Sequence, residues 1–165
     1  MKKEVREKIG AFSLVLLIVY GCIVLYFVLF SDRLGRTEGY STYRYNLMPF
    51  EEIRQFIVYR EYVSTEAFVL NLIGNLFVFF PIGVLVPLWR TKKTGGFLIL
   101  RYTFLCTLCI ETLQLITKVG VFDVDDLMMN TLGGMIGWVC YCAALKFFRY
   151  VGRRKGKTEK KKEKE

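Results

Sequence analysis

The sequence predicts an all-α membrane protein, a four-transmembrane-helix bundle with a short amphipathic helix in the first extracellular loop. Two observations support this fold class. The chain has 165 residues, of which 53% are hydrophobic. Four apolar stretches approach the ~20 residues that a helix needs to cross a bilayer. They cover residues 9–30, 68–89, 97–117 and 127–148, which leaves no room for a separate soluble domain.

The first stretch, residues 9–30, is longer than the apolar core of a signal peptide and lacks a small-residue cleavage site after it. We therefore expect a retained span. In the loop that follows, residues 49–62 place Ile53, Phe56 and Ile57 at helical spacing. This spacing is typical of an amphipathic helix lying on the membrane surface. Pro49 suits its first position, where the missing N–H costs nothing.

The other three stretches carry features of packed membrane helices. Pro81 is expected to kink the span 68–89. On the same span, Gly74 is expected to allow a close approach of another helix. Gly133 and Gly137 form a GxxxG step on the span 127–148, which is a common helix-packing device in membranes.

The basic residues of the chain indicate its orientation. Four precede the first span, three lie in the loop after the second, and ten lie between Lys146 and the C-terminus. Because cytoplasmic loops carry an excess of Lys and Arg, we expect both termini in the cytoplasm. The net charge of +9 then belongs to membrane flanks and predicts no nucleic-acid partner. We divide the chain into a cytoplasmic N-terminus (1–8), a membrane domain (9–148) and a basic, disordered cytoplasmic tail (149–165).

With this orientation, polar residues of three spans fall at one depth, near the outer leaflet. Ionisable side chains inside a membrane are rare and usually face a cavity, a partner or the bundle interior. The sequence therefore predicts a ligand-binding site here. Its expected residues are Asn71, Asn75, Glu111, Gln114, Asp123, Asp126 and Asn130.

The amphipathic segment in the first loop has two interpretations. It could form a lid over this polar site, with Asn46, Pro49 and Phe50 closing it. Alternatively, it is a connector with one apolar face. The sequence leaves both interpretations open.

Several motifs together resemble the VanZ-like family. They are NLMPF (46–50), NLIGN (71–75), FPIG (80–83), ETLQ (111–114), DVDD (123–126) and NTLG (130–133), and they cover about residues 44–137. The resemblance implies a small bacterial integral membrane protein. It also implies a role in resistance to teicoplanin, a lipid-bearing glycopeptide that targets cell-wall precursors, because the founding member is associated with that phenotype. The family's biochemical activity does not follow from it.

Three functions remain open for the polar site. It could bind a membrane lipid, a lipid-linked cell-wall precursor or a lipoglycopeptide, because acids and amides supply donors and acceptors for sugars and amides. It could belong to a metal-dependent enzyme acting on a lipid phosphate or pyrophosphate. In that case Asp123, Asp126 and Glu111 are the candidate ligands of Mg²⁺ or another divalent cation. It could also be purely structural, with Asp123 capping the fourth span. The chain has no histidine, which removes the commonest proton shuttle.

Overall fold

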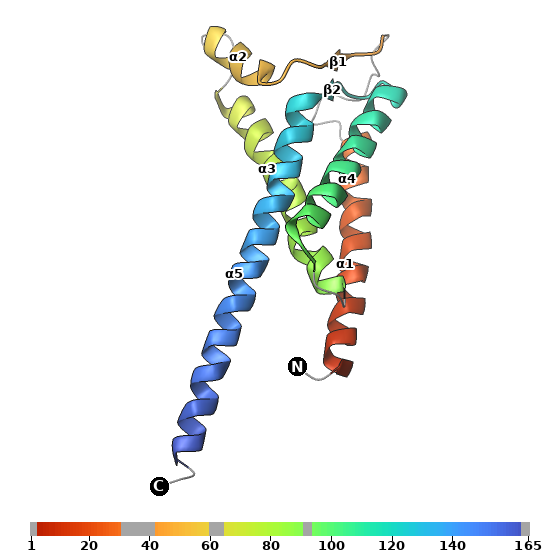
Figure 1. Cartoon of the computed structure of the whole chain (residues 1–165). Helices are drawn as coiled ribbons and strands as arrows, with labels where there is room; N and C mark the ends of the chain where they lie inside the picture. The colour runs from red at the N-terminus through yellow and green to blue at the C-terminus, as the bar shows by residue number, and fades with distance from the viewer. Residues whose placement is uncertain (1–2, 31–41, 60–64, 91–93, 163–165) are drawn as a thin grey trace.

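The computed structural model describes residues 3–30, 42–59, 65–90 and 94–162. Within these ranges, four long helices are apolar enough to cross a membrane, and they are joined by one short helix and two very short strands (Figure 1). The elements are α1 (Lys3–Phe30), β1 (Tyr45–Asn46), α2 (Glu51–Val58), α3 (Thr65–Trp89), α4 (Gly96–Thr117), β2 (Phe122–Asp123) and α5 (Val124–Lys162). The predicted all-α membrane fold is confirmed.

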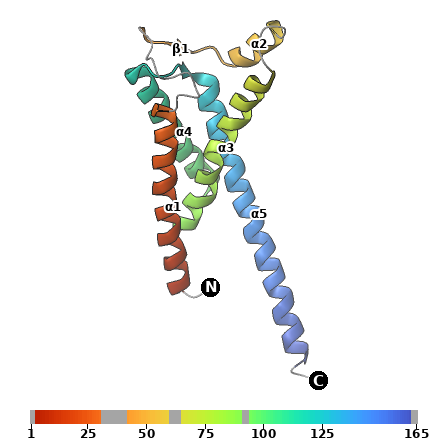
Figure 2. The same ribbon diagram turned by 180° about the vertical axis from the view of Figure 1, so that it is seen from behind.

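The helices alternate in direction, so the connections fall at two opposite ends of the bundle (Figures 1 and 2). Helix α2 and both strands lie at one end, which we call the loop end. Helix α1 begins and α5 finishes at the opposite end. Helix α5 packs against α3 and α4, while α1 packs against α3. The loop end therefore gathers the segments that begin α3, end α4 and begin α5.

Helices α3 and α5 touch through glycines. A Cβ added to Gly83 would lie 2.0 Å from the carbonyl oxygen of Gly134, and one added to Gly133 would lie 2.0 Å from a carbonyl oxygen of α3. Gly137 is in similarly close contact with α3. The predicted packing role of the GxxxG step is therefore confirmed. The expectation for Gly74 is wrong, because an added Cβ there would meet nothing within 4 Å.

Helix α5 differs from the expected boundary of the last span. It runs for 39 residues, to Lys162, whereas the sequence predicted a span ending at 148 and a disordered tail from 149. Lys, Arg and Glu dominate the added segment and are good helix formers, so loss of hydropathy ends the membrane span without ending the helix. At 1.5 Å per residue the helix is about 58 Å long, about twice the ~30 Å hydrocarbon core of a bilayer.

Helix α2 is the predicted amphipathic helix, but it is shorter than the expected range 49–62. It begins at Glu51 and ends at Val58, and residues 60–64 lie outside the described part of the chain. Pro49 lies in the turn before the helix. Phe50 precedes the first helical residue with φ of 64°, in the left-handed region. Few non-glycine residues adopt this conformation, and it departs from helical geometry one residue before Glu51.

Candidate functional site

The loop end is closed by a pairing between segments far apart in the sequence. Strands β1 and β2 run parallel, with Asn46 opposite Asp123. The side-chain amide of Asn46 donates to both carboxylate oxygens of Asp123, at 3.1 and 3.3 Å. The side-chain oxygen Oδ1 of Asn46 accepts the backbone N–H of Met48 at 3.1 Å. Asn46 thereby fixes the first loop against the start of α5.

Asp123 caps helix α5. Its Oδ1 accepts the backbone N–H of Asp125 at 2.8 Å, which is the hydrogen bond expected of an N-cap residue. Its own N–H donates to Oε2 of Glu111 at 3.2 Å. In a capping box, a glutamate of the same helix accepts this N–H. Here the acceptor, Glu111, belongs to a different helix, α4. Only 2% of Glu111 is exposed.

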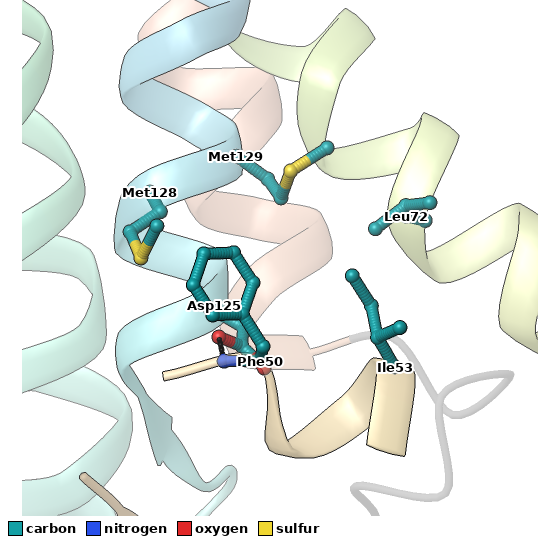
Figure 3. Close-up of a pocket in the computed structure, with 6 residues that line it drawn as sticks. All are labelled: Phe50, Ile53, Leu72, Asp125, Met128 and Met129. Carbon is teal, nitrogen blue, oxygen red and sulfur yellow. Dashed lines mark hydrogen bonds between the residues drawn. The ribbon is translucent and has the colours of Figure 1, made fainter. Parts of the chain in front are cut away.

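Asp125 connects α5 to the start of α2. Its Oδ1 accepts the backbone N–H of Phe50, and Figure 3 shows the two residues in contact. The Asp125 side chain is buried. Asp125 is not among the ligand-binding residues expected from the sequence. The signal available was its place in the first turn of a helix, where a carboxylate is favoured.

Asp126 connects α5 to α3. The side-chain amide of Asn75 donates to its Oδ1. This contact brings together two of the predicted site residues from different spans. The side chain of Asn71, which was expected beside Asn75, lies outside the described residues.

One turn further along α5, Asn130 contacts α4. Its amide nitrogen donates to the Thr107 hydroxyl at 2.8 Å, and both side chains are buried. The Asn130 Oδ1 is also buried, and the described part of the chain supplies no donor to it. Gln114 is buried and packs against Gly120 in the loop before β2. A Cβ added to Gly120 would lie 2.9 Å from the side-chain nitrogen of Gln114.

The structure therefore gathers most of the predicted site at the loop end. We call this group the polar cluster. It consists of Asn46, Asn75, Thr107, Glu111, Asp123, Asp125, Asp126 and Asn130. Gln114 lies beside the loop that leads into the cluster. Of the three expected lid residues, Asn46 hydrogen-bonds to Asp123 and Phe50 to Asp125. The third, Pro49, lies in the turn that precedes α2.

A family model described as VanZ/LLP1 matches residues 15–148. The chain belongs to the VanZ/LLP1 family. Protein VanZ from Enterococcus faecium is 27% identical over 128 residues, which cover 76% of this chain and 71% of that protein. No solved structure matches this chain. The predicted resemblance to VanZ-like proteins is thus confirmed.

In this VanZ/LLP1-family chain, the environment of Asp123 shifts its ionisation. Burial raises the pKa of its carboxyl above the usual value of 3.8. The hydrogen bonds from Asn46 and from the Asp125 backbone oppose this effect, and the negative charge of Asp125 adds to it. Desolvation disfavours the charged form of a carboxyl group, and here it outweighs the two hydrogen bonds.

The candidate metal ligands take different partners. Glu111 accepts the N–H of Asp123, while Asp126 accepts the amide of Asn75. Among the residues that the structure describes, no group of three His, Cys, Asp or Glu side chains could hold a metal ion. The trio of Asp123, Asp126 and Glu111 thus forms no such group, and a role for Mg²⁺ or another divalent cation stays a prediction.

Proposed function

We propose that this VanZ/LLP1-family protein modulates the susceptibility of the bacterial envelope to teicoplanin-type lipoglycopeptides. In this proposal, the polar cluster binds a lipid or lipid-linked ligand. The loop end faces the outside of the cell membrane, and both termini lie in the cytoplasm. The distribution of basic residues supports this orientation, because most of them precede the first span, separate α3 from α4 in the sequence or lie from Lys146 onward.

The observation that carries the proposal is the burial of Glu111 in a membrane helix, next to a second buried carboxyl group, that of Asp123. Only 2% of Glu111 and 8% of Asp123 are exposed. Burying a carboxyl group in a membrane helix is costly, and ionisable residues in such helices usually mark functional sites. Holding several carboxyl groups together at one end therefore favours a functional role over packing alone.

The chemistry of the cluster indicates the class of ligand. Carboxylates accept hydrogen bonds, and the amides of Asn75 and Asn130 both donate and accept. Such a site suits a headgroup rich in hydroxyl, amide or ammonium groups. A bare phosphate would be repelled by the neighbouring carboxylates. A lipid-linked cell-wall precursor and a lipoglycopeptide both carry sugars or amides attached to an alkyl chain.

The test is the inhibitory concentration of teicoplanin in a susceptible Gram-positive host, with vancomycin measured in parallel. Strains carry empty vector, the wild-type chain or Asp126→Asn at matched membrane levels. We expect the wild type to raise the teicoplanin value selectively and Asp126→Asn to return it to the vector level. Asparagine keeps an acceptor for Asn75 and removes the charge, so the fold is preserved.

Glu7→Gln provides the matched control. It makes the same change of charge near the start of α1, at the opposite end of the bundle, in an exposed pair with Lys3 at 3.9 Å. Exposed pairs contribute little to stability, so this variant should protect like the wild type. Absence of protection by well-expressed wild type, or full protection by Asp126→Asn, would contradict the proposal.

A further inference from the structure

A small cavity lies between α2 and the membrane helices, beside the polar cluster. Its volume is about 40 Å³, more than the ~10–15 Å³ that one water molecule requires. It is lined from α2 and its N-cap, from α3 and from α5 (Figure 3). The lining residues are Phe50, Ile53, Leu72, Asp125, Met128 and Met129.

The wall of this cavity is apolar. Of its lining residues only Asp125 has a polar side chain, and one oxygen of that carboxyl group already accepts the N–H of Phe50. A bound water needs two to four polar partners, and cavities lined by apolar side chains stay dry and take up apolar molecules. Carbon and sulfur atoms around the cavity thus favour a hydrocarbon occupant over water.

The cavity wall continues onto the outer flank of the bundle. Phe50 is 57% exposed, Met128 41% and Ile53 37%, so these side chains reach from the cavity to the surroundings. Ile73, the neighbour of Leu72 on α3, is 45% exposed. In a bundle of membrane-spanning helices, this apolar flank borders lipid. The medium next to the cavity therefore consists of alkyl chains.

We propose that this cavity holds part of an alkyl chain of a membrane lipid, with the headgroup of the same molecule at the polar cluster. The inference rests on the proposed function and adds the location of the chain. Lipid tails are as apolar as the cavity wall, so transfer from the bilayer gains little. The shape of the cavity then determines which alkyl chains fit, and the polar cluster supplies the favourable interaction with the headgroup. Methionine suits such a wall because its unbranched side chain adapts to irregular shapes.

Photolabelling tests the inference on the purified full-length protein. The protein is reconstituted in phosphatidylcholine liposomes that contain a phosphatidylethanolamine with a diazirine on one acyl chain, close to the ester carbonyl. The ammonium group of this probe complements the carboxylates of the cluster. After illumination, mass spectrometry locates the labelled residues. We expect labelling of Met128 and Met129 to exceed that of Val139, which is 56% exposed on the same helix.

Two tryptophan variants separate the cavity from general contact with lipid. Met129→Trp fills the cavity and should reduce labelling of the remaining lining residues several-fold. Leu132→Trp makes a similar change at a position of α5 that is 49% exposed and should leave their labelling unchanged. If Met129→Trp elutes as an aggregate in size-exclusion chromatography, Leu72→Trp fills the same cavity from α3 and serves in its place.

The outcomes distinguish this inference from the proposed function. Labelling of the lining residues no greater than that of Val139, or equal labelling in all variants, would overturn the cavity as a chain site. Loss of teicoplanin protection would leave the labelling result untouched. Conversely, Asp126→Asn that still protects would count against the proposed function alone, since the cavity is lined by other residues.

Discussion

At the contact of α3 with α5, backbone lies directly against glycine, whereas at the loop end side chains hydrogen-bond to each other and to the backbone. The first region brings a Cβ on Gly83 or Gly133 to 2.0 Å from a carbonyl oxygen. The second joins Asn46, Asp123 and Glu111 through donors and acceptors 3.1 to 3.3 Å apart. One region depends on shape and the other on hydrogen-bond partners.

This difference determines how each region responds to change. A glycine contact leaves no space for an added methyl group, so a single substitution separates the helices. The loop end consists of individual hydrogen bonds, each with a net contribution of about 1 kcal/mol. Single bonds can be lost there while the helices stay together. The contact of α3 with α5 can therefore keep the bundle intact while single hydrogen bonds at the loop end are broken.

The largest effect is expected from Gly83→Val. The added Cβ would lie 2.0 Å from the Gly134 carbonyl oxygen and 2.7 Å from the Trp138 backbone nitrogen. Because backbone atoms cannot move aside as side chains do, we expect a loss of about 3 kcal/mol of stability, the upper part of the overpacking range. Thermal unfolding in detergent, followed by size-exclusion chromatography, measures this loss.

Gly74→Ala is the matched control on the same helix, since an added Cβ there would meet nothing within 4 Å. Alanine is the better helix former by about 1 kcal/mol, so this variant should be as stable as wild type or slightly more so. Equal destabilisation by both variants would show that the close contact of α3 with α5 does not determine stability.

A smaller effect is expected from Glu111→Leu at the loop end. Leucine removes the acceptor for the buried N–H of Asp123, and an unpaired buried donor costs about 1–3 kcal/mol. Glu111→Gln keeps an oxygen in the same place and should cost less. The same thermal assay compares the two variants. A leucine variant as stable as the glutamine variant would contradict the capping role of Glu111.

The smallest effect concerns pH. The pKa of Asp123 in the folded state is raised above the usual 3.8, so the folded state favours the protonated form. Its contribution to stability is therefore complete below pH 3.8 and is lost as pH rises through the raised pKa. We expect the unfolding temperature to fall over this interval in the wild type and to fall less in Asp123→Asn.

Asparagine is as good an N-cap residue as aspartate, so the helix start should survive in this variant. Its amide nitrogen replaces one of the two oxygens that now face the Asn46 amide, and the lost hydrogen bond costs about 1 kcal/mol. The test compares the slope of the unfolding temperature against pH in the wild type and in Asp123→Asn. Identical slopes would assign the pH dependence to another group.

The spans could be predicted from the sequence because hydropathy measures what a membrane requires. The predicted ranges 68–89 and 97–117 agree closely with α3 and α4. The end of α5 was predicted incorrectly because apolar length and helix length are separate properties. A charged segment without proline continues the hydrogen-bond pattern beyond the membrane, and α5 reaches Lys162.

The candidate site was predicted in part for a similar reason. Charge-based orientation brought the polar residues of three spans to one end, and the structure places Asn75, Asp126 and Asn130 there in contact with other helices. The bond from Phe50 to Asp125 depends on a left-handed backbone at Phe50. The sequence does not signal this conformation, because phenylalanine rarely adopts it. The adjacent residues Asp125 and Asp126 thus accept hydrogen bonds from different elements, the N-cap of α2 and helix α3.

The pairing of β1 with β2 has a consequence for biosynthesis. The two-residue strands are too short to be stable alone, and Asn46 meets a partner 77 positions later in the chain. As the chain emerges from the ribosome, Asn46 cannot pair with Asp123 until Asp123 has been made and the segments of α3 and α4 between them have been synthesised. The two strands can therefore pair only after α1, α3 and α4 have been synthesised.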